Sequence, residues 1–153
     1  IIFSQVIYMI QLKKITGNKK IHLDLLLLAD PEEKAIDKYI NDSEIFSLIE
    51  NEKVLGQCAV TKIDKYRCEI KNIAIYEDLH NKGYGKKFIC DYYKYKYTSI
   101  LVGTADSGIE FYKKCGFKIS HKIKNFFINN YDEEIFDNGI QCIDMIYLEK
   151  KIK

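Results

Sequence analysis

The chain has 153 residues, 47% of them hydrophobic, which is enough to bury the core of one ordinary domain. Lys and Arg number 24 against 22 Asp and Glu, so the net charge of +2 predicts no broad basic face for nucleic acid or a membrane surface. The five cysteines form no CxxC pair and no cluster with metal-ligand spacing. We therefore expect a single domain over residues 1–153, with free thiols in a reducing cytoplasm, no metal, and no nucleic-acid or membrane partner.

The first half of the chain predicts one strand, two helices and then three strands. Residues 9–15 alternate in polarity as a strand does, whereas residues 1–8 are read either as an N-terminal extension or as more strand. Helical spacing follows in residues 21–30 and 31–41, and Pro31 suits the opening of the second helix. Polar pairs at 51–52 and 64–65 suit hairpin turns. They separate an expected antiparallel meander of strands 44–51, 53–63 and 66–76.

The second half predicts a helix, a strand, a helix and two closing strands. Phe88 and Tyr92 recur at helical spacing, and residues 99–103 read as a short buried strand. In the next helix, Ser107 and Glu110 match the capping-box spacing, and Gly116 suits the left-handed residue that ends a helix. Residues 117–128 and 140–150 read as strands joined by an acidic loop. The order predicts a layered α/β domain with a mixed sheet.

Two glycines, Gly83 and Gly85, stand one residue apart at the junction of a predicted strand and helix. Unpaired N–H groups at a helix N-terminus attract an anion, and glycine lets the backbone approach it closely. Lys87 excludes a P-loop, which needs Ser or Thr there, and Phe88 excludes the third glycine of a dinucleotide fingerprint. The segment therefore indicates either a different phosphate loop or a flexible turn.

The segment Glu69–Phe117 resembles the GNAT superfamily of acetyl-CoA-dependent N-acetyltransferases. "EIKNIAIYEDLHNKGYGKKF" is similar to the strand and Gln/Arg-x-x-Gly-x-Gly/Ala loop that bind the coenzyme A pyrophosphate, with His80 in place of Gln or Arg. "FYKKCGF" is similar to the family's later tyrosine-bearing element. The resemblance extends from about Met9 to the end of the chain and implies a GNAT-like mixed sheet of about six to seven strands, flanked by about four helices.

The resemblance implies three catalytic positions and a cofactor-binding set. Glu69 lies where several members carry a general base that acts through water, although an ordinary solvent-facing glutamate is the alternative. Ile73 lies where the family offers a backbone N–H to the thioester oxygen. Tyr112 matches the general acid for the departing thiolate, against the alternative of a core aromatic residue. The implied cofactor-binding residues are Ile73, Ala74, Ile75, His80, Asn81, Lys82, Gly83, Tyr84, Gly85, Lys86, Asp106 and Tyr112.

Other chemistry has simpler explanations. Cys68 and Cys115 have no histidine close in sequence, which favours direct acetyl transfer over an acyl-enzyme. The alternation of Tyr and Lys in residues 91–99 suits core packing better than base stacking. The acidic residues of 132–137 are either a solvated loop or a surface that attracts a cationic amine.

The sequence thus predicts a cytoplasmic N-acetyltransferase that moves an acetyl group from acetyl-CoA to a primary amine of a small molecule or peptide. The alternatives are acetylation of a protein N-terminus or lysine, a non-catalytic acetyl-CoA sensor, and a nucleic-acid-binding module. A homodimer is left open.

Overall fold

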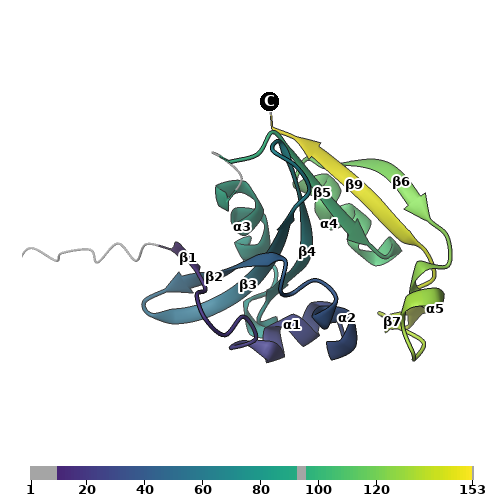
Figure 1. Ribbon diagram of the computed structural model, residues 1–153, viewed down its shortest axis with the longest axis horizontal. Helices are drawn as coiled ribbons and strands as arrows, with labels where there is room; N and C mark the ends of the chain where they lie inside the picture. Colours follow the sequence, from purple (N-terminus) through teal and green to yellow (C-terminus); the bar gives the residue numbers. More distant parts are fainter. Residues whose placement is uncertain (1–9, 93–95, 153) are drawn as a thin grey trace, which may run out of the picture.

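The computed structural model describes residues 10–92 and 96–152, and it shows the predicted mixed α/β fold (Figure 1). The five α-helices among these residues are α1 (Leu23–Ala29), α2 (Glu33–Asp37), α3 (Tyr84–Tyr92), α4 (Ile109–Lys114) and α5 (Phe126–Asn130). The strands of the main sheet are β1 (Gln11–Lys14), β2 (Ser43–Glu50), β3 (Lys53–Lys62), β4 (Arg67–Ile75), β5 (Ser99–Thr104), β6 (Lys118–Ile123) and β9 (Met145–Lys151).

Among the described residues, the main sheet has seven strands in the order β1-β2-β3-β4-β5-β9-β6. Strands β2 to β4 form the predicted antiparallel meander, and β1 pairs antiparallel with β2 at its edge. Its first tight turn is made by Asn51 and Glu52, whose φ values of 51° and 64° suit the right-handed twist of a hairpin. At the second turn, the Asp64 carboxylate accepts the N–H groups of Tyr66 and Arg67 at 2.8 and 2.9 Å. The meander prediction is confirmed.

Strand β4 separates from β5 halfway along its length. The two strands pair in parallel only from Arg67–Ile70 to Ser99–Val102. Lys71 is an extra residue in the pairing of β4 with β3, because Ala59 faces Asn72 while Val60 faces Ile70. A bulge of this kind bends and twists a strand. The second half of β4 therefore stays with β3, while β5 continues beside β9, and the sheet opens between them.

The end of the chain differs from the two closing strands that we predicted. Strand β6 ends at Ile123, and Asn125, with a φ of 55°, turns the backbone into α5, so residues 126–128 are helical rather than extended. Asn138 and Gly139, both with positive φ, form the turn of a separate hairpin of β7 (Phe136–Asp137) and β8 (Ile140–Gln141). Strand β9 then enters the main sheet between β5 and β6 (Figure 1).

The predicted capping box at the N-terminus of α4 is wrong, whereas the predicted left-handed residue after its C-terminus is confirmed. The Ser107 hydroxyl donates to the Asp137 carboxylate instead of capping the helix, and Gly108 occupies the N-cap without a side-chain bond. Gly116 has the left-handed φ of 92° expected after the helix. The Phe117 N–H donates to the Tyr112 carbonyl at 3.0 Å, so the helix end is satisfied as a Schellman motif satisfies it.

The sheet separates two apolar clusters. Helices α3 and α4 cover one face, where Phe88 and Tyr112 pack against residues of β3, β4 and β5. Helices α1 and α2 cover the other, where Leu26 and Ile36 pack on Ile45 and Ala59. Because side chains alternate along a strand, Glu69 and Asn72 lie on the α1/α2 face, opposite Thr61 and Ala59.

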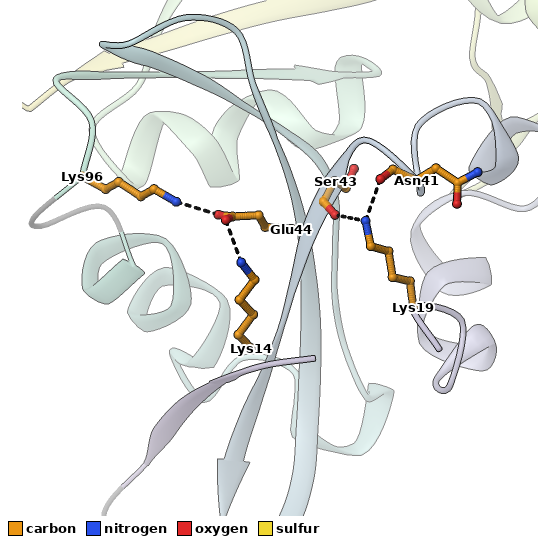
Figure 2. Close-up of polar contacts among 6 residues, drawn as sticks. All are labelled: Lys14, Lys19, Asn41, Ser43, Glu44 and Lys96. Carbon is orange, nitrogen blue, oxygen red and sulfur yellow. Dashed lines mark hydrogen bonds and ion pairs between the residues drawn. The ribbon is translucent and has the colours of Figure 1, made fainter. Parts of the chain in front are cut away.

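Lysine contacts fix the N-terminal segment against β2 (Figure 2). Lys14 and Lys96, from segments far apart in sequence, each place Nζ 2.8 Å from the Glu44 carboxylate. The Lys19 ammonium donates to the carbonyls of Asn41 and Ser43 at 2.6 and 2.7 Å. These bonds hold the loop before α1 beside the turn that leads from α2 into β2. The helix pair α1/α2 therefore has a defined position over the sheet.

Two predictions lie outside the described residues. These are the assignment of residues 1–8 and the packing of the Tyr92 side chain. The single domain over residues 1–153 stays a prediction.

Candidate active site

The divergence of β4 from β5 opens a cleft of about 420 Å³. Residues 70–73 of β4 line one side and residues 102–105 of β5 and its following loop line the other. Gly108 and Tyr112 contribute from the start and the middle of α4. The cleft therefore follows directly from the register of the sheet.

Backbone donors of β4 point into this opening. The Tyr76 N–H donates to the Leu55 carbonyl on β3 at 3.1 Å. Because successive N–H groups of a strand point to opposite sides, Ile73 and Ile75 direct theirs away from β3, toward the side that β5 has left. A donor that has lost its strand partner suits the carbonyl oxygen of a thioester, which is the role predicted for Ile73. Ala74 directs its N–H toward β3 instead, because it lies two residues before Tyr76 on the same strand.

Tyr112 projects from α4 into the wall of the cleft. Its side chain is 8% exposed, and its ring makes edge contacts with Phe111 and Phe117. Burial, followed by the neighbouring Cys58 and Cys115, raises the pKa of its hydroxyl above the usual value. The phenol therefore keeps its proton at neutral pH, as a general acid must. Tyr112 is at once a core residue and a lining residue of the cleft.

The glycine loop leads from β4 into the N-terminus of α3. The first helical bond runs from the Lys87 N–H to the Gly83 carbonyl at 3.0 Å, so the N–H groups of residues 84–86 have no partner within the helix. Gly83 has a φ of 81° and open space where a Cβ would be. Asn81 also has a positive φ of 61°, and Lys82 and Lys86 are exposed. This geometry suits a phosphate, as predicted from the motif.

His80 makes a contact that the sequence did not predict. Its Nε2 lies 2.7 Å from the Ile75 carbonyl, so this nitrogen carries the proton and donates to the backbone. A neutral imidazole then has only an acceptor left at Nδ1, which cannot donate to a phosphate. The side chain ties the loop to the end of β4. Asp106 is exposed in the turn before α4 and is absent from the lining of the cleft, whereas its neighbour Ser107 contributes to that lining.

A second cavity, of about 170 Å³, adjoins the cleft on the α1/α2 face. Six of the described residues line both: Asp30, Ile70, Lys71, Gly103, Tyr131 and Met145. Glu69 lines the second cavity, and its Oε1 accepts bonds from the Lys71 ammonium at 3.1 Å and the Tyr147 hydroxyl at 3.0 Å. Both contacts use the same oxygen, so Oε2 keeps its capacity to take a proton. Glu69 is thus anchored in a cavity, unlike an ordinary surface glutamate.

Gly103 makes the contact between Tyr147 and Glu69 geometrically feasible. Strand β5 lies between β4 and β9, so the Tyr147 side chain must cross it to reach Glu69. A Cβ on Gly103 would lie 3.1 Å from the Tyr147 ring and 2.7 Å from the Met145 sulfur. Glycine at this position therefore leaves the room that the anchoring tyrosine needs.

A hydrogen-bonded network lies where the second cavity meets the cleft: Asp30 and Tyr131 line both, Tyr39 lines the cavity and Asn72 lines the cleft. Asp30, at the C-terminal end of α1, accepts the hydroxyl of Tyr131 at 3.0 Å and that of Tyr39 at 3.4 Å. Asn72 donates to the Tyr39 oxygen at 3.0 Å and to the Leu26 carbonyl at 2.9 Å. Burial raises the pKa of Asp30, against the smaller opposing effect of its Tyr131 bond. Sequence reasoning identified none of these four side chains as functional.

Part of the predicted acidic surface is engaged with other residues. The Asp132 carboxylate pairs with Lys34 at 2.5 Å, and this ammonium lowers the carboxyl pKa. The Glu32 carboxylate accepts the N–H groups of Asp132 and Glu133 at 3.0 and 3.2 Å. The segment thus fastens the connection between α5 and β7 (residues 131–135), here called the C-terminal arm, to the start of α2. Its steering of a cationic amine stays a prediction.

Four of the five cysteine thiols are buried, and all five are thiols rather than halves of a disulfide. Burial raises the pKa of Cys68 to about 12 and also raises that of Cys142, which lines the cleft. Within residues 10–92 and 96–152, no group of three or more His, Cys, Asp or Glu side chains could hold a metal ion. None of the helices in this described part is long and apolar enough to cross a membrane.

Comparison with known proteins identifies the class of protein to which the chain belongs. Residues 41–119 match the family model described as an acetyltransferase (GNAT) domain. An uncharacterised N-acetyltransferase of Bacillus subtilis strain 168, YvbK, is 39% identical over 132 residues, which are 82% of this chain and 85% of the relative. The class is therefore an acetyl-CoA-dependent N-acetyltransferase.

Solved structures agree with this class. A GNAT family acetyltransferase from Elizabethkingia anophelis with acetyl-CoA bound has a TM-score of 0.86 and 37% identity, covering 94% of this chain and 98% of that one. A Bacillus subtilis acetyltransferase in complex with CoA has a TM-score of 0.82 and 33% identity, covering 95% and 100%. The chain belongs to the GNAT superfamily, and acetyl-CoA is its cosubstrate.

Proposed function

We propose that this enzyme transfers the acetyl group of acetyl-CoA directly to a primary amine of a small molecule or peptide. The observation that carries the proposal is the junction at Ile70, Lys71 and Gly103, where the cleft meets the cavity that contains Glu69. An acetyl group held in the cleft and an amine held in the cavity would meet there. Bringing two reactants together in this way supplies much of the catalysis of group transfer.

Three groups of the chain carry the proposed chemistry. The bound cosubstrate supplies an activated acetyl thioester. The Ile73 N–H donates to the thioester oxygen and stabilises the negative charge that develops on it. Glu69 Oε2 removes the proton of the acceptor ammonium through water, so that a neutral amine attacks the carbonyl carbon. Tyr112 protonates the departing thiolate.

The glycine loop and the N-terminus of α3 are proposed to bind the coenzyme A part of the cosubstrate. The N–H groups of residues 84–86 and the backbone around Gly83 bind the pyrophosphate, helped by Lys82 and Lys86. In this proposal His80 acts indirectly, by holding the loop against Ile75. Direct transfer is favoured because the cysteine of the cleft, Cys142, is a buried thiol with a raised pKa and a weak nucleophile. The cysteines, which are thiols rather than disulfides, support a further proposal, that the protein works in a reducing cytoplasm.

An acceptor panel tests the function. The enzyme is incubated with acetyl-CoA and one amine at a time, covering aliphatic, aromatic and amino-acid amines and peptides, and the release of the CoA thiol is followed. We expect at least one small amine to accelerate thiol release above the rate of hydrolysis alone. A panel in which only folded proteins accept the acetyl group would contradict the small-molecule assignment.

A further inference from the structure

Two carboxylates face the cavity beside the cleft, and only one of them is neutralised. Glu69 forms an ion pair with Lys71 at 3.1 Å. Asp30 receives hydrogen bonds from the neutral hydroxyls of Tyr131 and Tyr39. No Lys, Arg or His nitrogen of the described residues lies within 4.0 Å of its carboxylate. The negative charge of Asp30 is therefore without a counter-ion in this wall.

An unpaired carboxylate in such a place needs an explanation. Asp30 is only 8% exposed, and the nearby Glu32 carboxylate, which is also negative, disfavours its charge further. Burying a charge without a partner of opposite sign is costly. A carboxylate accepts about four hydrogen bonds, and two tyrosine hydroxyls donate to that of Asp30. It can therefore accept one more donor, and a cationic donor would supply the missing charge.

The rest of the cavity suits a flat apolar group. Its volume of about 170 Å³ is well below the roughly 300 Å³ at which pockets for drug-sized ligands begin. Two exposed residues, Lys38 and Asn130, line it, so it reaches the surface beside them. Aromatic and thioether side chains make up much of the wall: Tyr39, Phe126, Tyr131, Met145 and Tyr147.

We propose that Asp30 binds the ammonium group of the acceptor, and that the acceptor is a small primary amine on a flat apolar or aromatic body. This inference rests on the proposed function and names its substrate class. Asp30 attracts the charged form of the amine, and the aromatic wall holds its body. Glu69, already paired with Lys71, is left to take the proton.

A purely structural role for Asp30 makes different predictions. Its bond to Tyr131 joins residues 101 positions apart and helps to hold the C-terminal arm on α1. If that were its whole purpose, removing the Tyr131 hydroxyl would have the same effect as removing the Asp30 charge. If Asp30 binds an ammonium, only the loss of its charge removes the preference for a cation.

The test compares two ligands that differ in charge and little in shape. Binding of 2-phenylethylamine and of 2-phenylethanol to the CoA-saturated protein is measured by calorimetry. We expect the amine to bind the wild type roughly 10- to 100-fold more tightly, the range for a hydrogen bond to a charged group. Asp30→Asn should abolish this difference, and Tyr131→Phe should retain it. Asp24→Asn is the matched control, because Asp24 is exposed on the same helix, bonds to Tyr76 and lines neither cavity.

Each remaining outcome overturns the inference. It fails if Asp30→Asn keeps the preference, if Tyr131→Phe loses it, or if the wild type binds the two ligands equally or binds neither. It also fails if 1,4-diaminobutane, which has no flat apolar body, binds more tightly than 2-phenylethylamine. The wild-type and Tyr131→Phe results do not depend on the folding of Asp30→Asn. Failure of the proposed function is separate, since it would appear as no amine-dependent thiol release across the whole panel.

Discussion

The substitution Tyr112→Phe removes one hydroxyl group from the wall of the cleft and should separate catalysis from packing. The ring contacts with Phe111 and Phe117, at centroid distances of 5.0 and 5.6 Å, do not involve the hydroxyl. We therefore expect the free energy of unfolding to change by about 1 kcal/mol or less, the net worth of a hydrogen bond. General acid catalysis contributes about 10²- to 10⁴-fold, which corresponds to about 2.7–5.4 kcal/mol of activation free energy. The loss of turnover should thus far exceed the loss of stability.

Tyr97→Phe is the matched control, because Tyr97 is also 8% exposed in the same apolar cluster but lines neither cavity. Thiol release at saturating acetyl-CoA and acceptor gives kcat, and thermal melting gives the stability of each variant. Since burial raises the pKa of Tyr112, the wild-type acid stays protonated up to at least about pH 10. The defect should therefore be the same from neutral pH to that limit. A kcat for Tyr112→Phe within about threefold of that of Tyr97→Phe would refute the acid role.

Three further substitutions test the base, the phosphate loop and the acceptor cavity. Glu69→Gln should depress kcat/KM most at neutral pH and recover as pH rises, because more of the acceptor is then already neutral; a pH profile parallel to that of the wild type would exclude the base role. Gly83→Val should abolish the stabilisation of about 2.7 kcal/mol that acetyl-CoA gives at about 100-fold excess over Kd, because valine is strained at a φ of 81°; an unchanged melting shift would contradict the loop assignment. Gly103→Ala should displace Tyr147 and Met145 and raise the acceptor KM more than that of acetyl-CoA, and an equal rise in both would count against the acceptor cavity.

The order of elements was predictable wherever local signals agreed with the final contacts. The meander from β2 to β4 has strong alternation and short turns, and both appear in the structure. The apolar residues 126–128 suit either a strand or a helix by pattern alone, and the positive φ of Asn125 decides for the helix. The hairpin at Asn138 and Gly139 had a usable signal, because Asn-Gly is a strong hairpin dipeptide. Ser107 fails as a cap because Asp137, 30 residues away, takes its hydroxyl.

The segments proposed for the cofactor could be read in the sequence, whereas the wall proposed for the acceptor could not. The glycine loop and the tyrosine-bearing helix are contiguous motifs, so their spacing carries the information. The acceptor wall is assembled from contacts such as Asp30 with Tyr131 and Glu69 with Tyr147, which span 101 and 78 positions. No local pattern reports pairs of this kind. In the sequence, Tyr147 looks like any aromatic residue of a strand. Only the order of the strands shows that its side chain passes over Gly103 to reach Glu69.

The position of β9 in the sheet has a consequence for how the protein acquires its activity during folding. This strand follows all of its sheet partners in the chain, yet it lies between β5 and β6. Strand β6 therefore has no place in the main sheet until β9 arrives, and such long-range pairing is intrinsically slow. Because β9 carries Tyr147, an intermediate that lacks this strand has no hydroxyl to hold Glu69. During refolding, acetyl transfer should therefore return in the same kinetic phase as the insertion of β9, and it should lag behind formation of the meander.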